Sequence, residues 1–266
     1  MSGWLKFNGL DLTYDLGLRI GGVRSYGTSW RSGQSVRVPG RLGEPLLDTA
    51  LLDIPNEIRE YNAAIYLRNA SSEGVAQAMS RIRAALLKDE RYYVLEDSYE
   101  PSFYRLAFWQ NDVIPSRKGA GQNFELPLRF SCDPRRFIKQ GIGPTVMEAG
   151  GGLTAQITAE NVTGYAVTEK ANPVIKVVGG GQAFTLKLGK LSSLMDYGEI
   201  QFAAFTRTVW FDVDSMSASY DEEGRYNANA QILDVSGDLH LLPEGSIFTR
   251  SDTSVRIEIT PRWWVR

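Results

Sequence analysis

The chain has 266 residues, of which 43% are hydrophobic and 23% are charged, and its formal net charge is −2. These values are typical of globular proteins, and the length is sufficient for one large domain or two ordinary ones. The first 138 residues hold 18 basic and 16 acidic side chains, and the remainder hold 11 and 15. Neither half therefore has the basic excess that is typical of nucleic-acid binders. No stretch of the sequence approaches the ~18 apolar residues that a membrane-spanning helix needs.

A single cysteine, Cys132, excludes an internal disulfide and a zinc site with several cysteines. We expect it to be a small buried hydrophobe rather than a reactive thiol. Residues 1–6 lack the apolar core of a secretion signal. Both features predict folding in a reducing cytoplasm.

The first half of the chain predicts short strands with one buried face. Apolar residues alternate over 16–20 and 36–38, and a longer strand with an irregular middle is predicted over 58–67. The segment between them is rich in proline and glycine. Because proline removes a backbone donor and fixes φ, we expect an extended connection there rather than a central strand. The apolar side chains of this segment are Leu46, Leu47, Leu51, Leu52 and Ile54. They need a surface to pack against, and a neighbouring subunit would supply that surface.

One amphipathic helix is predicted over 72–88. Its apolar side chains recur at spacings of four, three and four residues, which places them on one face: Val75, Met79, Ile82 and Leu86. Strands are then predicted over 92–96, 104–109 and 124–130. Strands, one helix and further strands indicate an α+β sandwich or split barrel.

Residues 139–153 are the predicted linker, because they carry five glycines and a proline with no sustained period. Beyond them, alternation over 184–188, 209–213 and 255–259 predicts an antiparallel β-sandwich. We therefore expect a mainly β protein with two domains, 1–138 and 154–266. The residues after Thr260 are candidates for a return to the first domain.

Few residues could carry chemistry. His240 is the only histidine and has no second histidine or cysteine nearby to complete a metal site. No Gly-x-Ser-x-Gly elbow is present, and the glycine runs lack the Lys-Ser/Thr of a phosphate loop. An acidic group at 212–223 lacks the order of a calcium-binding EF-hand and is interpreted as an acidic turn. We therefore expect no catalytic residue, no metal and no cofactor.

Three tryptophans lie beside arginines at loop or chain ends: Trp30, Trp263 and Trp264. Tryptophan and arginine are enriched at interfaces because they bury large areas and provide directional donors. These tryptophans are therefore candidates for a subunit interface, and ordinary core packing is the alternative.

The order of the motifs resembles the distal tail proteins of long-tailed (siphovirus-type) phages and prophages, which are hub components of the tail tip or baseplate. The stretches that carry the resemblance are Arg-Val-Pro-Gly-Arg-Leu-Gly at 37–43, the helix at 72–88, Tyr-Tyr-Val-Leu-Glu-Asp at 92–97, Pro-Ser-Phe-Tyr-Arg-Leu-Ala at 101–107, Phe-Ser-Cys-Asp-Pro at 130–134 and Ile-Thr-Pro-Arg-Trp-Trp at 259–264. Together with the change to an all-β pattern, the resemblance covers nearly the whole chain.

In that family the first domain resembles a tail-tube subunit and closes into a hexameric ring, and the second resembles a galectin-like β-sandwich. The resemblance implies a structural virion protein without enzymatic activity. It would be made in the bacterial host cytoplasm and located at the virion tail tip. The implied partners are other copies of the chain, the tail-tube protein, a tail-associated hub protein and a receptor-binding protein, but no membrane and no specific nucleic acid. The ring interface would use Arg37, Pro39, Arg41, Leu46, Leu47 and Leu51.

Two other classes of function remain open. A carbohydrate-binding module would use Trp210 and Tyr226 as stacking platforms. However, the clustered His-x-Asn-Pro-Arg motif of sugar-binding galectins is missing, so a lectin-like fold does not imply lectin activity. A β-rich hydrolase would need a deep pocket that holds two carboxylates with perturbed pKa values.

Overall fold

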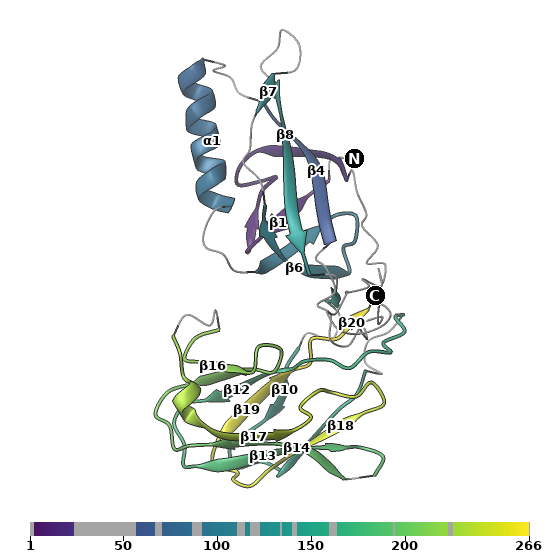
Figure 1. Cartoon of the computed structure of the whole chain (residues 1–266), viewed down its shortest axis with the longest axis vertical. Helices are drawn as coiled ribbons and strands as arrows, with labels where there is room; N and C mark the ends of the chain where they lie inside the picture. The colour runs from purple at the N-terminus through teal and green to yellow at the C-terminus, as the bar shows by residue number, and fades with distance from the viewer. Residues whose placement is uncertain are drawn as a thin grey trace, which may run out of the picture. The chain divides into compact units, whose positions relative to one another are not determined.

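The computed structural model describes residues 3–23, 57–66, 71–86, 92–110, 115–117, 123–133, 135–139, 143–159, 164–193, 195–222 and 226–265. The chain forms two compact units that divide between Arg136 and Phe137 (Figure 1). The described elements are one α-helix, a short 3₁₀ helix and strands in three antiparallel sheets, so the predicted mainly β class is confirmed. None of the described helices is long and apolar enough to cross a membrane.

The first unit is built on a curled antiparallel sheet with the strand order β2-β1-β5-β6-β8-β4-β3. Its ends approach each other, because Gly3, just before β1, forms an isolated bridge with Ile20 of β3. A further short strand, β7, pairs with β8. The bounds are β1 Leu5–Phe7, β2 Leu10–Asp11, β3 Leu18–Val23, β4 Glu57–Tyr66, β5 Tyr93–Asp97, β6 Phe103–Trp109, β7 Ser116–Arg117 and β8 Asn123–Cys132.

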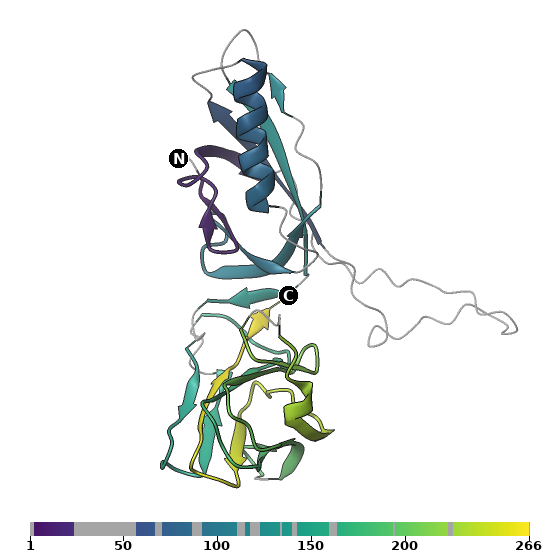
Figure 2. The ribbon, with the colours of Figure 1, turned by 90° about the vertical axis from the view of Figure 1, so that its left-hand side faces the viewer.

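The predicted helix is confirmed as α1, Ser72–Leu86. The Gly74 amide donates to the Ser71 hydroxyl at 3.1 Å, which satisfies one of the free donors of the first turn. Its apolar stripe packs on the concave side of the sheet, where Met79, Ile82 and Leu86 join the core (Figure 2). Burial of each such side chain contributes about 1.5–3 kcal/mol. The helix therefore closes the core of the first unit.

The second unit contains two five-stranded antiparallel sheets, with the orders β10-β19-β12-β15-β16 and β11-β18-β13-β14-β17. Along most strands every second residue is buried, as in β12 and β13, which is typical of a β-sandwich. The bounds are β10 Thr145–Met147, β11 Thr154–Ile157, β12 Val174–Val178, β13 Phe184–Lys190, β14 Asp196–Phe202, β15 Val209–Asp212, β16 Ser217–Ser219, β17 Ile232–Gly237, β18 Ser246–Arg250 and β19 Arg256–Thr260, with a 3₁₀ turn at Asn229–Gln231. In addition, β9 (Arg136–Ile138) pairs with β20 (Trp264–Val265).

The structure differs from the sequence expectation at 139–153. Residues Thr145–Met147 form β10, which pairs with β19, so this part of the expected linker is a strand of the second unit. The chain passes between the units earlier, between Arg136 and Phe137. The high glycine content of this stretch therefore has another cause.

That cause is the buried side chain of Arg250, which is 1% exposed. Its guanidinium donates to the backbone oxygens of Glu148 at 2.7 Å, Gly152 at 2.9 Å and Val255 at 2.5 Å. A Cβ at Gly151 would lie 2.9 Å from the Glu148 oxygen, which is closer than real Cβ contacts. Gly150 has a positive φ of 74°, and Gly151 has no room for a side chain beside the Glu148 oxygen, so both positions favour glycine where the backbone turns around the guanidinium.

Replacing Arg250 with Met should destabilise the second unit. The methionine keeps much of the apolar volume but removes the guanidinium hydrogen bonds to the backbone oxygens of Glu148, Gly152 and Val255. We therefore expect a loss of about 3 kcal/mol in the free energy of unfolding. Guanidinium chloride denaturation of the full chain measures this loss. The matched control is Arg256→Met, whose side chain is 43% exposed and whose replacement should cost no more than about 1 kcal/mol. Equal losses in the two variants would contradict the role assigned to Arg250.

Candidate functional site

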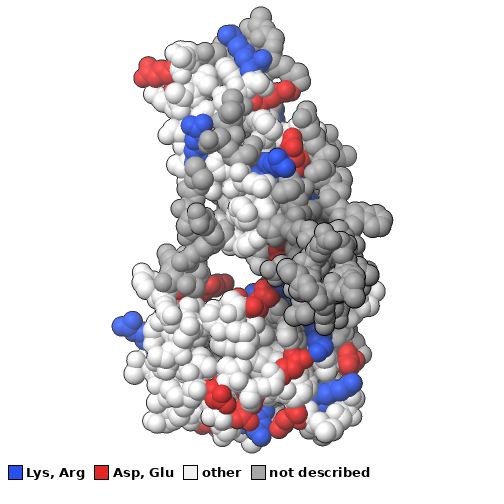
Figure 3. All heavy atoms as spheres, viewed as in Figure 1, with Lys and Arg blue, Asp and Glu red and all other residues white. Residues whose placement is uncertain are grey.

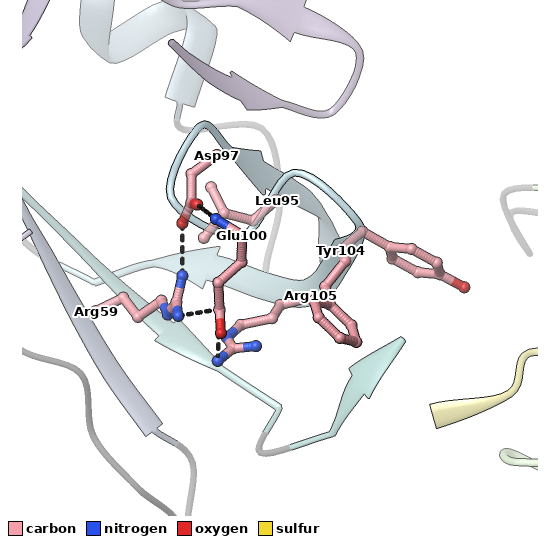
Figure 4. Close-up of a pocket in the computed structure, with 7 residues that line it drawn as sticks. Arg59, Leu95, Asp97, Glu100, Tyr104 and Arg105 are labelled. Carbon is pink, nitrogen blue, oxygen red and sulfur yellow. Dashed lines mark hydrogen bonds and ion pairs between the residues drawn. The ribbon is translucent and has the colours of Figure 1, made fainter. Parts of the chain in front are cut away.

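A cluster of charged side chains lies in the first unit where β4 begins and β5 ends (Figure 4). Arg59 comes from β4, Asp97 ends β5, and Arg105 lies in β6; their exposed fractions are 2%, 4% and 4%. Glu100 comes from the turn between β5 and β6. Charged side chains are almost never buried to this degree unless they are paired. We therefore expect each of these buried charges to have a partner of opposite sign.

Each charge of this ion network has a partner of opposite sign. Arg59 donates to Asp97 Oδ2 at 2.5 Å and also to Glu100. Arg105 Nη2 lies 3.1 Å from Glu100 Oε2, and Arg136 Nη1 lies 3.4 Å from Glu100 Oε1. Glu100 therefore contacts three arginines, and one of them, Arg136, ends the continuous segment 1–136 of the first unit.

The local sequence Asp-Ser-Tyr-Glu at 97–100 shapes the turn that places Glu100. The second oxygen of Asp97 accepts the backbone N–H groups of Tyr99 at 2.9 Å and Glu100 at 2.8 Å. This is the side-chain-to-backbone turn that aspartate favours. Asp97 thus fixes the turn with one oxygen and holds Arg59 with the other.

Tyr61 completes the network from β4. Its hydroxyl donates to Asp97 Oδ2 at 2.5 Å and accepts from Arg59 Nη1 at 3.3 Å. Burial, and next the negative charge of Asp97, raise the pKa of Tyr61 well above its usual value, although Arg59 acts in the opposite direction. For Arg59, burial by itself lowers the pKa, but Tyr61, Asp97 and Glu100 outweigh burial and raise it. At neutral pH, therefore, the Tyr61 hydroxyl is uncharged and the Arg59 guanidinium is positively charged.

The network leaves little room for a ligand. The pocket beside it has a volume of about 10 Å³, which is room for a single water molecule. Within the described ranges, no group of three or more His, Cys, Asp or Glu side chains could hold a metal ion. The arrangement can fasten β4 to the β5–β6 turn, and removing one partner of such a buried pair typically costs about 3–5 kcal/mol.

Most of the predicted interface residues lie outside the described residues: Trp30, Arg37, Pro39, Arg41, Leu46, Leu47 and Leu51. The two remaining candidates belong to the second unit. Trp263 is 3% exposed, so its indole ring is part of the core of its own chain. Trp264 is half-buried, and its indole N–H donates to the Lys170 backbone oxygen at 3.0 Å. Neither indole ring is therefore fully exposed at the surface.

The segment that carries these tryptophans is fastened by Arg262. Its guanidinium contacts both carboxylate oxygens of Asp212, at 3.1 and 2.5 Å, and donates to the Asn172 backbone oxygen at 2.7 Å. Asp214 accepts the side-chain amide of Asn172. Two carboxylates of the acidic group at 212–223 are therefore engaged by donors of the protein.

The other residues considered from the sequence also have structural contacts. Asp238 accepts Lys170 Nζ at 2.6 Å and contacts the ring of His240. Burial raises the pKa of Asp238, but these hydrogen bonds outweigh it and lower that pKa to about 2. Lys176 Nζ lies over the Trp210 ring, 5.4 Å from the ring centroid. The lysine therefore occupies one of the two ring faces on which a sugar could stack. Figure 3 shows acidic and basic side chains intermixed over the second unit.

Comparison with solved structures finds this fold in phage tail proteins. The SPP1 Dit protein (gp 19.1), a paradigm of the hub adsorption apparatus in phages that infect Gram-positive bacteria, matches with a TM-score of 0.60 and 14% identity, over 98% of this chain and 99% of that chain. A chain of the phage P2 baseplate in its activated conformation with Ca matches with a TM-score of 0.50 and 12% identity, over 94% and 98%. The sequence matches no protein-family model and no curated protein. The resemblance to distal tail proteins is therefore confirmed at the level of the fold.

The raised pKa of Tyr61 predicts a pH dependence of stability. Above pH ~10 the hydroxyl ionises in the unfolded chain but not in the folded one, so stability falls as the pH rises, by at most about 1.4 kcal/mol per pH unit. Tyr61→Phe removes this dependence, and it costs about 1–2 kcal/mol below pH 10, where the hydrogen bonds are intact. Denaturant midpoints of parent and variant should therefore converge between pH 9 and pH 11 (about two pH units).

The control is Tyr66→Phe, in the same strand but 54% exposed. It removes a tyrosine hydroxyl without touching the network, and it should follow the parent curve. Parallel curves for the parent and Tyr61→Phe would show that Tyr61 does not hold its proton through the network.

Proposed function

We propose that this chain is a structural hub protein of a phage tail tip or baseplate. The observation that carries the proposal is the likeness to SPP1 Dit over 98% of this chain and 99% of that chain, across both units. A likeness that includes both units in one order supports a shared architecture rather than one shared domain. The proposed location is the virion tail tip, after synthesis and assembly in the cytoplasm of a bacterial host.

The proposed role is to join the tail tube to the tail tip through a closed ring of six copies. A tail tube encloses a channel, and identical subunits can enclose a channel only through head-to-tail contacts that close by rotation. The first unit is proposed to form the ring, and the galectin-like second unit to lie at its periphery. The proposed partners are the tail-tube protein, a tail-associated hub protein and a receptor-binding protein.

Such a role needs surfaces rather than an active site, and we propose that the chain is not an enzyme. Three arginines with several hydrogen bonds each support this view, because they hold strands and turns together. Arg59 links β4 to the β5–β6 turn, Arg250 holds the glycine turn, and Arg262 fastens the C-terminal segment. Each contact stabilises the scaffold on which interaction surfaces are displayed.

The ring is tested by replacing three leucines of the proposed interface, Leu46, Leu47 and Leu51, with aspartate. A stable interface buries on the order of 1,000–2,000 Å², and three buried charges without partners would abolish it. Light scattering should give six times the 29.6 kDa chain mass for the parent and a folded monomer for the variant.

The matched control replaces three exposed apolar residues of the second unit with aspartate: Leu153, Met195 and Leu233, which are 50%, 71% and 63% exposed. This variant should keep the hexamer mass. A parent protein that stays monomeric at high concentration would contradict ring formation by the chain alone. An unfolded first unit in the leucine variant would place those leucines in its own core, so that the interface lies elsewhere.

A further inference from the structure

The tight turn between β1 and β2 contains the only asparagine of the chain that is followed by a glycine, Asn8, with Gly9 after it. Phe7 pairs with Leu10 across this turn. Both central residues have positive φ, 52° at Asn8 and 76° at Gly9, as in the type I′ turn that joins two strands through two residues. A Cβ at Gly9 would meet nothing within 4 Å, so the turn uses glycine for its backbone conformation rather than for space.

An asparagine followed by glycine can lose ammonia without an enzyme. The backbone nitrogen of Gly9 forms a bond to Cγ of Asn8, the bond from Cγ to the amide nitrogen breaks, and that nitrogen leaves as ammonia with the Gly9 proton. The product is a succinimide ring, which water opens at either carbonyl to leave aspartate or isoaspartate at position 8. Glycine favours ring closure because it has no Cβ to hinder the approach of its nitrogen. The new carboxyl group adds one negative charge at neutral pH.

The conformation of the turn opposes this ring closure. Asn8 has positive φ and therefore occupies the left-handed region, where ψ is about +30 to +60°. At such a ψ the Gly9 nitrogen lies across the Cα–C bond from Cβ, whereas the ring needs the two atoms on the same side. Asn8 must therefore rotate about ψ by roughly half a turn before it reacts. The Asn8 N–H donates to the Val94 oxygen at 2.9 Å, so the rotation displaces the residues that follow Asn8 rather than β1.

The element that this rotation displaces is β2, which is small and lies at one end of the sheet. It consists of Leu10 and Asp11, both half-buried, and it pairs with β1 at the end of the strand order. The next residue, Leu12, is 0% exposed, and its N–H donates to the Leu5 oxygen at 2.9 Å. Opening of the turn can therefore stop at Leu12 and leave the core intact. Such short edge segments open at a lower free-energy cost than the whole domain.

We propose that Asn8 is a site of spontaneous deamidation and that local opening of β2 sets the rate of this modification. Isoaspartate adds one carbon to the backbone within the turn, so the turn no longer matches the pairing of Phe7 with Leu10. Aspartate keeps the backbone length but places a second carboxylate close to Asp11. Because the ammonia is lost, the change is irreversible, and the β1–β2 hairpin stays weakened. The site lies within one chain and does not depend on the proposed ring.

Peptide mapping of the full chain after incubation at mildly alkaline pH tests the proposal. Trypsin cleaves after Lys6 and Arg19, and peptide 7–19 contains no amide side chain other than that of Asn8. Its mass reports the exchange of amide for carboxyl, and chromatography separates the aspartate and isoaspartate forms. We expect Asn8 to convert faster than any other asparagine of the native chain, but on the order of tenfold or more slowly than in urea-unfolded chain. Non-denaturing urea should barely change the native rate, because local opening exposes little surface.

The matched control is Asn8→Gly, which removes the amide and keeps a sequence suited to positive φ at both turn positions. Its peptide 7–19 should keep its mass under the same conditions. Faster conversion of another asparagine in the native chain, or no conversion of Asn8 there, overturns the assignment of the site. Equal rates in native and unfolded chain show that the turn gives no protection, and a steep rise with non-denaturing urea shows that global unfolding is needed. Either result overturns the control of the rate by β2.

Discussion

A buried guanidinium group needs hydrogen-bond acceptors, and the first unit depends on how Arg59 meets this need with carboxylates. Asp97 and Glu100 both contact it, and they belong to one turn, so a single arginine fixes the start of β4 to the end of β5. β4 lies between β3 and β8, and the β5–β6 turn determines how β5 pairs with β6. Loss of one partner costs about 3–5 kcal/mol because the other charge stays buried.

The second unit satisfies a buried arginine in another way. Arg250 is surrounded by backbone oxygens, and the chain supplies them by winding a glycine-rich turn around the guanidinium. The cost of burying the charge is offset by several charge-assisted hydrogen bonds to these backbone oxygens. In both units, therefore, an arginine at an inward strand position holds a turn.

The regular part of this fold could be predicted from periodicity, whereas its charged contacts could not. Val75, Met79, Ile82 and Leu86 identify α1 because a helix repeats every 3.6 residues, and alternation identifies most strands of both units. Arg59 and Arg105 occupy inward positions where alternation favours apolar residues, and their partners are distant in sequence. The glycines at 150–152 were interpreted as a linker because composition does not reveal a buried guanidinium. For Trp263 the sequence left a subunit interface and core packing open, and its 3% exposure places the ring in the core of the chain.

The central claim is that copies of this chain close into a ring through the first unit. Electron cryo-microscopy of the purified full-length protein at high concentration tests this claim most directly. The account predicts particles with six-fold symmetry and a central opening, in which the first units form a continuous ring and the second units lie outside it. Images that contain only single chains, or open helical filaments, would contradict it.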